Sequence, residues 1–354
     1  MRYQGQTEYD HQGKEQPQGI LLTNLGTPDA PTTASVRRYL REFLADPRVV
    51  EIPRILWMLI LYLFILPLRP SRSAKLYQQV WTENGSPLMD ITLRQSSALQ
   101  TQLDQRFGAN RYVVATGMRY GNPSMASALQ LLKQHNVGKI TVLPLYPQYS
   151  GVTTGSTFDA LAQELTRYRW IPELHFISGY HKHRLFIQAL SDSIEQHIEQ
   201  HGMPQRLLFS YHGTPLNCLE KGDPYFCFCS QTTRLVIEHM GLDPDSVITT
   251  FQSRFGKAQW LQPYTSVTLQ ELAGSGIEKV AVVCPGFSAD CLETIEEIEC
   301  ENREYFVEAG GKQYHYIPCL NDSAAHIDMM VALIKPEQAE LMPPADNPLL
   351  SPQT

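Results

Sequence analysis

Short apolar runs alternate along this chain with longer stretches in which apolar residues recur at helical spacing. The apolar runs have the length of buried strands and lie at 19–24, 112–116, 139–145, 207–210 and 279–284. The longer stretches predict amphipathic helices at 124–134, 157–168, 183–200 and 231–240. This alternation is typical of an α/β fold, in which parallel sheets are flanked by helices on both faces.

The same rhythm occurs twice, which predicts two similar domains at 19–175 and 176–334 with a cleft between them. The polar segment 1–18 and the Pro-rich segment 335–354 are expected to be disordered. Several strands end in loops that carry Gly, Pro or polar residues. In such folds ligands bind outside the carboxyl ends of the strands, so these loops should converge on the site.

Composition narrows the functional classes. The chain has 354 residues and a net charge of −7, which gives no electrostatic support for a nucleic-acid partner. Seven cysteines are too few for a disulfide scaffold, and the polar N-terminus lacks an apolar signal-peptide core. We therefore expect reduced thiols and a cytoplasmic protein. Neither a dinucleotide-binding Gly-x-Gly-x-x-Gly after a strand nor a P-loop motif occurs.

One apolar segment, 55–66 (ILWMLILYLFIL), has twelve unbroken apolar residues and basic residues on both sides. A membrane-spanning helix needs about 20 such residues, so this segment is too short. It is either a buried core helix or an apolar lip that lies on a bilayer, with Arg54, Arg69 and Arg72 at the headgroups. We favour the lip, because apolar residues would face every side of the helix.

A second segment, 288–304, is rich in carboxylates. At about 100° per residue, one helix face would carry Asp290, Glu293, Glu297, Glu301 and Glu304. The row is either a solvated acidic surface or a set of ligands that carries a divalent cation into the cleft. Its place directly after a predicted buried strand favours the second interpretation.

Three further groups could take part in chemistry. His212 stands at the end of a strand and is followed by Gly and Pro, where a catalytic imidazole is expected. Arg119 and Tyr120 follow another strand and could bind an anionic, aromatic ligand. Cys218, Cys227 and Cys229 match no structural zinc pattern; they are either plain thiols or ligands of an iron–sulfur cluster.

Taken together, these motifs make the chain resemble the ferrochelatase family, whose members insert ferrous iron into protoporphyrin IX in the last step of haem synthesis. The matching segments lie in order over about 19–334: Asn24–Pro28, Gly85–Pro87, Arg119–Tyr120, Tyr146–Gly155, Ser210–Gly213, Gly222–Pro224, Trp260–Pro263 and Phe287–Thr294. The resemblance implies two Rossmann-like domains with four-stranded parallel sheets around a porphyrin cleft.

The resemblance also implies roles for single residues. His212 would be the active-site histidine and Glu293 its partner across the cleft, with Fe²⁺ as the metal substrate. The implied metal-handling set is His212, Glu293, Glu297, Glu301 and Asp290. The implied porphyrin-contacting set is Leu25, Ser86, Arg72, Lys75, Arg119, Tyr120, Tyr146 and Trp260. Segment 55–66 falls in the apolar lip of the family, which favours peripheral attachment to the inner face of the cytoplasmic membrane.

Some positions depart from the family pattern. Cys291 stands where many relatives have His, and Leu25 where some have Met. Gly151 occupies the position of a cluster-binding Cys in animal-type members, so that type of 2Fe-2S site is excluded, whereas a different cluster on the three thiols stays open. His212 is either the acceptor of the pyrrole protons or the first iron ligand. The competing functions are a cobalt or nickel chelatase and a non-catalytic porphyrin carrier. The chain is expected to be a monomer or homodimer.

Overall fold

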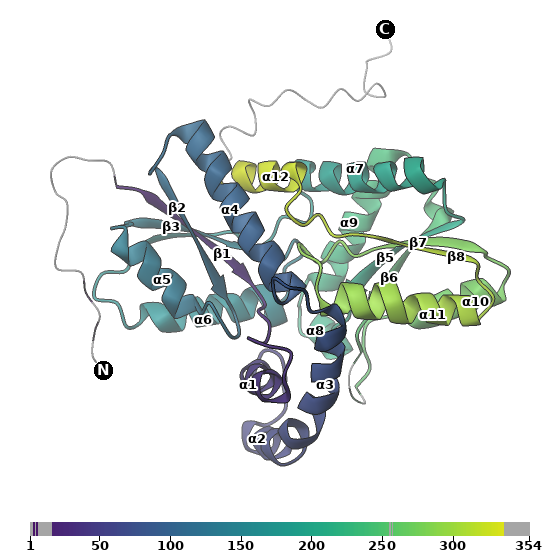
Figure 1. The fold of residues 1–354 in the computed structure, drawn as a ribbon, viewed down its shortest axis with the longest axis horizontal. Coiled ribbons are helices and arrows are strands. Elements are labelled where there is room, and N and C mark those ends of the chain that lie inside the picture. Colours follow the sequence, from purple (N-terminus) through teal and green to yellow (C-terminus); the bar gives the residue numbers. More distant parts are fainter. Residues whose placement is uncertain (1–2, 4, 6–15, 255, 257, 336–354) are drawn as a thin grey trace, which may run out of the picture.

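The fold contains two four-stranded sheets in which every neighbouring pair of strands is parallel (Figure 1). The computed structural model describes residues 3, 5, 16–254, 256 and 258–335. The first sheet has the order β2-β1-β3-β4, with β1 Gln18–Asn24, β2 Tyr112–Met118, β3 Lys139–Pro144 and β4 Glu173–Phe176. The second has the order β6-β5-β7-β8, with β5 Arg206–His212, β6 Val247–Gln252, β7 Lys279–Val283 and β8 Gln313–Ile317. The predicted α/β class is confirmed.

Alternate residues of each strand face different cores, as the two-residue period of a strand requires. Ile20 and Leu22 of β1 belong to a large core that also contains Leu207 and Phe209 of β5, so a single apolar cluster runs through both halves. Leu21 points to the other face and packs in a separate cluster of the first half. Most of the predicted disordered termini, 1–18 and 335–354, lie outside the described residues.

Helices cover both faces of each sheet. The helices that share the large core are α4 Pro87–Phe107, α7 Arg184–His201, α9 Tyr225–Met240 and α12 Ala324–Ile334. The outer face of the first sheet is covered by α5 Met125–Gln134 and α6 Ser156–Leu165. The outer face of the second sheet is covered by α10 Thr265–Gly274 and α11 Asn302–Glu308. The remaining short elements are α8 Leu216–Glu220, η2 Gly151–Gly155, η3 Pro244–Ser246 and η4 Glu293–Glu301.

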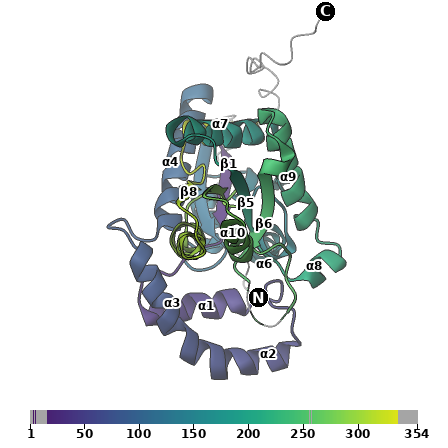
Figure 2. The same ribbon diagram turned by 90° about the vertical axis from the view of Figure 1, so that its right-hand side faces the viewer.

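A helical lip projects from this body (Figures 1 and 2). It consists of α1 Thr33–Leu44, α2 Arg54–Ile60, η1 Leu61–Ile65 and α3 Leu66–Val80. The last three form one helix of 27 residues that is long and apolar enough to cross a membrane by length and composition. Trp57 anchors it, because the indole nitrogen donates a hydrogen bond of 2.6 Å to the Leu44 carbonyl. Trp57, Leu61 and Leu66 pack into a small core within the lip.

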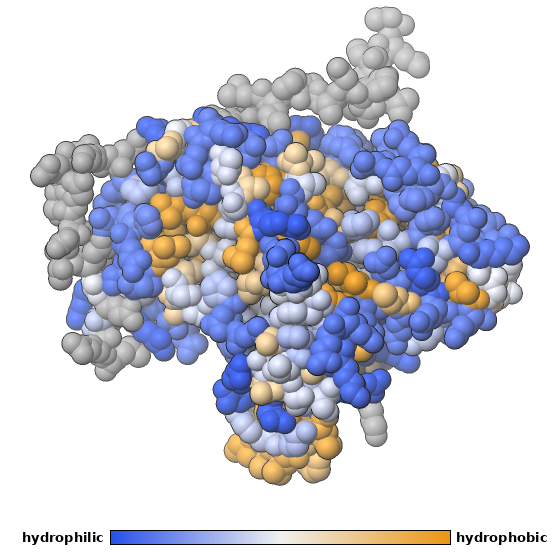
Figure 3. All heavy atoms as spheres, in the orientation of Figure 1, coloured by the Kyte–Doolittle hydropathy of each residue, from blue (hydrophilic) through white to orange (hydrophobic). Residues whose placement is uncertain are grey.

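The rest of the apolar segment is not buried. Ile55 is 82% exposed, and six more side chains at the tip of the lip are exposed: Leu56, Leu59, Tyr62, Leu63, Phe64 and Leu68. These residues form an apolar patch at the tip of the molecule (Figure 3). Segment 55–66 is therefore not a buried core helix, and its surface requires another explanation.

Candidate active site

The loops at the carboxyl ends of the second sheet meet around His212, the last residue of β5. The next residue must be glycine, because a Cβ on Gly213 would lie 2.9 Å from the Gln252 carbonyl oxygen and 3.2 Å from Cε3 of Trp260. This close approach seats the Trp260 ring beside the backbone that carries His212. Trp260 is thus brought to the predicted site.

The His212 ring is oriented by its own chain. Its Nδ1 lies 2.7 Å from the Gly213 carbonyl oxygen, which can only accept a hydrogen bond. Nδ1 must therefore carry the proton in the neutral ring, and the lone pair is on Nε2. The Phe287 ring, from the loop after β7, lies with its centroid 6.4 Å from that of His212. The result is an imidazole whose Nε2 can take up a proton or bind a metal ion.

The acidic segment forms a π-helix, η4, rather than the α-helix that the sequence predicted. In a π-helix the backbone bond runs from residue i to i+5, and here the Asn302 N–H donates to the Glu297 carbonyl. Each turn holds more residues than an α-helix, so side chains five apart become neighbours. The residues that form the carboxylate row therefore differ from those expected at 100° per residue.

Glu297 is the central carboxylate of this helix. Its two oxygens accept hydrogen bonds from the Ser253 backbone N–H, at 2.7 Å, and from the Ser253 hydroxyl. Burial raises the pKa of Glu297, while the Ser253 hydrogen bonds and the charge of His212 act in the opposite direction and Glu293 adds to the increase. Glu297 is therefore a partly compensated carboxylate that interacts electrostatically with His212.

Glu293 lies at the start of η4. Its negative charge contributes to the electrostatic field around the lip helices α1 and α3. Burial is the main reason why the pKa values of Tyr39 and Tyr77 are raised, and the negative charge of Glu293 increases both further. Burial and then Glu293 also raise the pKa of the Cys291 thiol. The Glu293 carboxylate is thus close to α1 and α3, where the lip meets the second half. The thiol of Cys291 stays protonated at neutral pH.

Asp290 does not belong to the carboxylate row, which corrects the sequence expectation. It precedes η4, and its Oδ1 accepts hydrogen bonds from the Thr294 hydroxyl at 3.0 Å and the Tyr316 hydroxyl at 2.5 Å. Its Oδ2 accepts a bond of 2.7 Å from the Asn321 side chain. With both oxygens engaged and the residue buried, Asp290 ties the start of η4 to β8, and its part in handling metal stays a prediction.

Glu296 takes a place in the row that the sequence analysis did not assign. Burial raises its pKa, and the charges of Glu301, Glu293 and Glu304 raise it further. Glu301 follows Glu296 by five residues, the spacing that a π-helix brings together. Glu301 is exposed and accepts a hydrogen bond of 2.7 Å from the Tyr305 hydroxyl. The row therefore leads from the buried Glu297 region to solvent at Glu301 and Glu304.

The first half contributes a closed polar network. Oδ2 of buried Asp46 accepts hydrogen bonds from the Arg119 guanidinium at 2.5 Å, the Tyr120 hydroxyl at 2.8 Å and the Ser156 hydroxyl at 2.5 Å. Oδ1 accepts one from the Arg48 backbone N–H at 2.8 Å. Burial alone would raise the pKa of Asp46, but the hydrogen bonds and the charge of Arg119 outweigh it, so the pKa is lowered.

The predicted porphyrin-contacting residues divide into two groups. Tyr120 is fully buried beneath the network, and its contact with a porphyrin stays a prediction. Tyr146 and Ser86 are also buried, and the Ser86 hydroxyl accepts a hydrogen bond from Thr27 at 2.9 Å. The residues that remain at least partly accessible are Leu25, Arg72, Lys75, Arg119 and Trp260.

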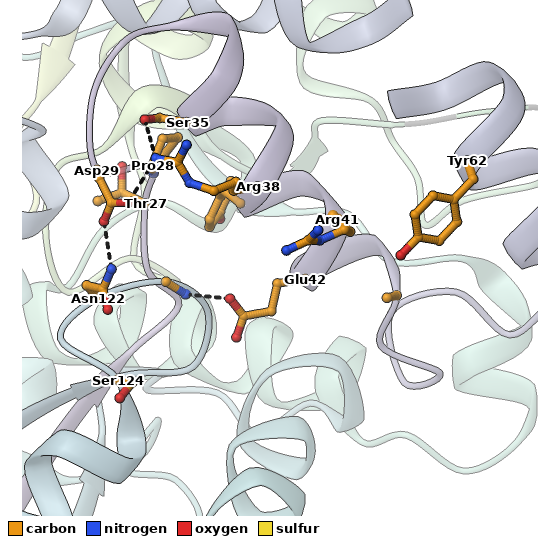
Figure 4. A pocket seen from close by; sticks show the side chains of 13 residues that line it. Thr27, Pro28, Asp29, Ser35, Arg38, Arg41, Glu42, Tyr62, Asn122 and Ser124 are labelled. Atoms are coloured by element: carbon orange, nitrogen blue, oxygen red, sulfur yellow. Dashed lines mark hydrogen bonds and ion pairs between the residues drawn. The ribbon is translucent and has the colours of Figure 1, made fainter. Parts of the chain in front are cut away.

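A cavity of about 540 Å³ lies between α1 and the loops that follow β1 and β2 (Figure 4). Its polar side chains are bonded to one another: Asn122 donates to Asp29 at 2.9 Å, and Arg38 donates to Ser35 at 2.8 Å. Among the described residues, its lining includes Tyr39 but neither His212 nor the carboxylates of η4. The described residues that line the cavity therefore do not supply the chemical groups of the second-sheet site.

The fold does not support the three thiols as cluster ligands. Cys227 and Cys229 lie two residues apart on α9, so their side chains point about 200° apart around the helix. Cys229 is fully buried and Cys227 exposed, while Cys218 lies on α8. In the described part of the chain, the three sulfur atoms do not form a group close enough to share a metal. The three thiols are therefore not gathered around one ion in the described residues, and a 2Fe-2S cluster on them stays a prediction.

The second-sheet site therefore combines a basic imidazole nitrogen, a partly compensated carboxylate and an acidic path to solvent. This set can remove protons from a weakly acidic N–H and accompany a divalent cation.

Comparison with known proteins gives consistent results. The family model described as "Ferrochelatase" matches residues 17–338. The chain is 58% identical over 318 residues to Ferrochelatase 2 of Shewanella oneidensis, covering 90% of this chain and 97% of that protein. It is 54% identical to a ferrochelatase of Idiomarina loihiensis, over 95% of this chain and 92% of that one.

A solved structure is similar in fold alone. SirB from Bacillus subtilis, with Fe³⁺, superposes with a TM-score of 0.52 at 12% identity, over 92% of this chain and 98% of that chain. This likeness matches the two parallel sheets described above.

Proposed function

This chain belongs to the ferrochelatase family and is a metal chelatase of haem biosynthesis, and we propose that His212 and helix η4 perform its chemistry. The reaction inserts Fe²⁺ into protoporphyrin IX, gives protohaem and releases two protons. The observation that carries the assignment of residues is the electrostatic pairing of His212 with Glu297, a carboxylate whose pKa burial raises.

The pyrrole protons leave first toward His212. With Nδ1–H held by the Gly213 carbonyl, Nε2 is the acceptor, and imidazole is the side chain whose ordinary pKa suits proton transfer near neutral pH. Each proton taken up makes His212 positive, and the negative charge of Glu297 stabilises that state. A carboxylate with a raised pKa can then accept the proton, which resets the imidazole for the second transfer.

Iron approaches along the carboxylates. Glu301 is exposed, Glu296 is partly buried and Glu293 lies where η4 meets the lip, so the row runs from solvent toward the cleft. Oxygen ligands suit a hydrated divalent cation and release it more readily than thiolates would. We assign delivery of Fe²⁺ to these three residues and proton transfer to His212 and Glu297. In the alternative assignment, Nε2 of His212 is the first iron ligand.

Replacing His212 tests the proposal. His212→Ala should lower the rate of anaerobic iron insertion by at least about 10²-fold, the scale of a lost general base, while porphyrin still binds. Loss of porphyrin fluorescence reports turnover, and fluorescence anisotropy reports binding. His135→Ala, at an exposed position on the first half, is the matched control and should leave the rate unchanged.

The outcomes separate the competing functions. Near-normal insertion by His212→Ala would refute the assignment. Stoichiometric binding without turnover by the wild-type chain would favour a carrier, or a chelatase for cobalt or nickel. Added imidazole can replace the missing side chain of His212→Ala as a proton acceptor. If it restores proton transfer while the insertion rate stays independent of iron concentration, the alternative in which His212 is the first iron ligand fails.

We further propose that the lip lies on the inner face of the cytoplasmic membrane. The tip exposes seven large apolar side chains, and α3 carries Arg69, Arg72 and Lys75 behind them, where anionic headgroups would lie. Protoporphyrin is itself poorly soluble in water, so a cleft that opens beside a bilayer would receive it directly.

A membrane-spanning position of the long lip helix is less consistent with the fold than contact with the membrane surface. The second part of the long helix packs against α1 through Ala74 and Tyr77, and Tyr77 lies in the field of Glu293. Withdrawing this part into a bilayer would break that packing and place three basic residues in hydrocarbon. All groups of the proposed site come from one chain, so either a monomer or a homodimer would be competent.

Vesicle flotation tests the membrane proposal. The triple variant Leu59→Ser, Leu63→Ser, Phe64→Ser should lose most of its binding to vesicles that contain anionic lipid, yet keep its insertion rate with detergent-solubilised porphyrin. Val307→Ser with Leu131→Ser removes exposed apolar surface elsewhere and should float like the wild type. Equal flotation of the triple variant would refute the lip as the contact.

A further inference from the structure

Three histidines gather on the second half, at the edge of the sheet away from the proposed active site. His197 and His201 lie four residues apart on α7 and so share one face of that helix. His315 lies on the edge strand β8 and completes the group. The ring centroids are 4.5 Å apart for His197 and His201, 4.7 Å for His201 and His315, and 5.2 Å for His197 and His315.

The fold gives this group an unsatisfied nitrogen. Nε2 of His197 is buried and has no hydrogen-bond partner among the described residues. A buried polar atom without a partner costs about 1–3 kcal/mol, so such atoms call for an explanation. His197 and His315 are half-buried, while His201 is exposed and gives solvent a path to the group.

The nitrogens are close enough to converge on one ion. One ring nitrogen from each residue can be chosen so that all three lie within 4.8 Å of one another. Zinc binds imidazole at about 2.0–2.1 Å, which places the nitrogens of a tetrahedral site about 3.4 Å apart. The rings would need to close by about 1–1.5 Å, a rotation that a half-exposed cluster allows.

We propose that His197, His201 and His315 bind one divalent transition-metal ion of the zinc class, with solvent as the fourth ligand. Neutral imidazole is a preferred ligand of Zn²⁺, Cu²⁺ and Ni²⁺, and three of them leave one open position. Burial and the neighbouring positive charges lower the pKa of His197 to about 4 and also lower that of His315.

Two cations near the group act against binding and set its strength. Lys279 contributes to the lowered pKa of His197, and Arg303 to that of His315. The Lys279 ammonium donates hydrogen bonds to the carbonyls of His201 and Gly202, which it caps at the end of α7. The three ligands are neutral, and the nearby side chains are positively charged. Binding of a metal ion would therefore depend on the strength of the imidazole–metal bonds and not on electrostatic attraction of a cation.

The group is separate from the iron-inserting site. His315 pairs with Ala281 of β7, which pairs with Leu207 of β5. His212 lies five residues further along β5, which corresponds to about 16 Å along the strand. An ion held by the three histidines would join the last turn of α7 to β8 and would not meet the porphyrin.

Metal stoichiometry tests the proposal on the full chain without a histidine tag. Equilibrium dialysis against Zn²⁺, followed by elemental analysis, should give one equivalent per chain fewer for His201→Gln and for His315→Gln than for the wild type. His212→Ala removes the imidazole of the catalytic site and should retain the histidine-site equivalent. His135→Gln is the matched exposed control and should bind as much as the wild type.

Two further measurements make the result decisive. Co²⁺ bound at this site should show the visible absorption of a tetrahedral complex, which His315→Gln should abolish while His212→Ala keeps it. Iron insertion by His201→Gln should be unchanged, which shows that the variant is folded. Unchanged zinc stoichiometry in both histidine-site variants, or a cobalt spectrum that survives His315→Gln, would overturn the proposal.

Discussion

The first sheet, β2-β1-β3-β4, and the second, β6-β5-β7-β8, repeat one topology, yet their carboxyl ends hold polar side chains in different ways. Beside the first sheet, Arg119 and two hydroxyls converge on Asp46, so its carboxylate is saturated and its pKa is lowered. Beside the second, Ser253 is the hydrogen-bonding partner that the described part of the chain supplies to Glu297, and burial raises the pKa of Glu297.

The contrast shows how the same burial produces opposite results. Desolvation raises the pKa of either carboxyl group, and the number of donors and the nearness of a cation decide the sign. Asp46 is anchored as an anion and serves the architecture. The pKa of Glu297 is raised by burial, which moves it toward the range that suits a proton-transferring group. In this comparison the carboxylate of the first half has a structural role, and the carboxylate of the second half has a chemical one.

Glu297→Gln should produce the largest change in this comparison. The amide keeps the shape and can still bond Ser253, but it cannot accept a proton, so iron insertion should fall by about 10²-fold. Because the pKa of Glu297 is raised by folding, its ionisation costs stability as pH rises through and above the unfolded value of 4.5. The variant should therefore gain stability relative to the wild type when the pH is raised from 4 to 7.

Turnover assays and urea denaturation at both pH values measure these two effects. Glu308→Gln, an exposed carboxylate on α11 outside the site, is the control for a lost charge and should change neither quantity. Wild-type turnover by Glu297→Gln would mean that Glu297 takes no part in the chemistry and that the two sheets do not differ as argued.

The sequence predicts the central strands and one edge strand, β2, and misses the other edge strands. The runs that form β1, β3, β5 and β7 are apolar because helices bury them on both faces. β4 and β8 lie at sheet edges and are partly exposed, as in the mixed run Gln313–Ile317. β6 is also an edge strand, and its first residues are only half-buried. Such strands lack a continuous apolar run, so hydrophobic pattern alone cannot identify them.

Because the sequence does not predict strand β6, one residue of the site is missed as well. Ser253, which binds Glu297, follows the carboxyl end of β6, where a site residue is expected once that strand is recognised. The π-helix has no signal in the pattern, because a helix is expected to turn by 100° per residue. That assumption placed Asp290 in the row and left Glu296 out. Backbone hydrogen bonding between residues five apart becomes visible only in the structure.

The thiols illustrate a boundary error. The sequence predicts a helix over 231–240, whereas α9 begins at Tyr225. The Asp223 carboxylate accepts a hydrogen bond of 3.0 Å from the Tyr225 N–H, and Pro224 precedes the helix, which are ordinary start signals. With the helix extended to these residues, Cys227 and Cys229 fall on opposite sides, and their closeness in sequence loses its meaning as a ligand set.

Asp46→Asn tests the structural half of the comparison, with a smaller effect than Glu297→Gln. The amide nitrogen would face donors from Arg119, Ser156 and Tyr120, so the variant should lose about 1–3 kcal/mol of unfolding free energy at neutral pH. Because folding lowers the pKa of Asp46, this stabilisation is complete above the unfolded value of 3.8 and is lost as pH falls through the folded pKa. Denaturation at pH 7 and pH 3 should show the difference between variant and wild type shrinking in acid.

Tyr120→Phe refines the same test, since it removes one donor and leaves the carboxylate. It should cost about 0.5–1.5 kcal/mol, less than Asp46→Asn, because Asp46 keeps Arg119 and Ser156. Tyr120 is fully buried, so porphyrin affinity measured by fluorescence anisotropy should not change. Weakened porphyrin binding with unchanged stability would instead place Tyr120 against the ligand. In that case the Asp46 network would be part of the binding surface, and the first half would share directly in recognition.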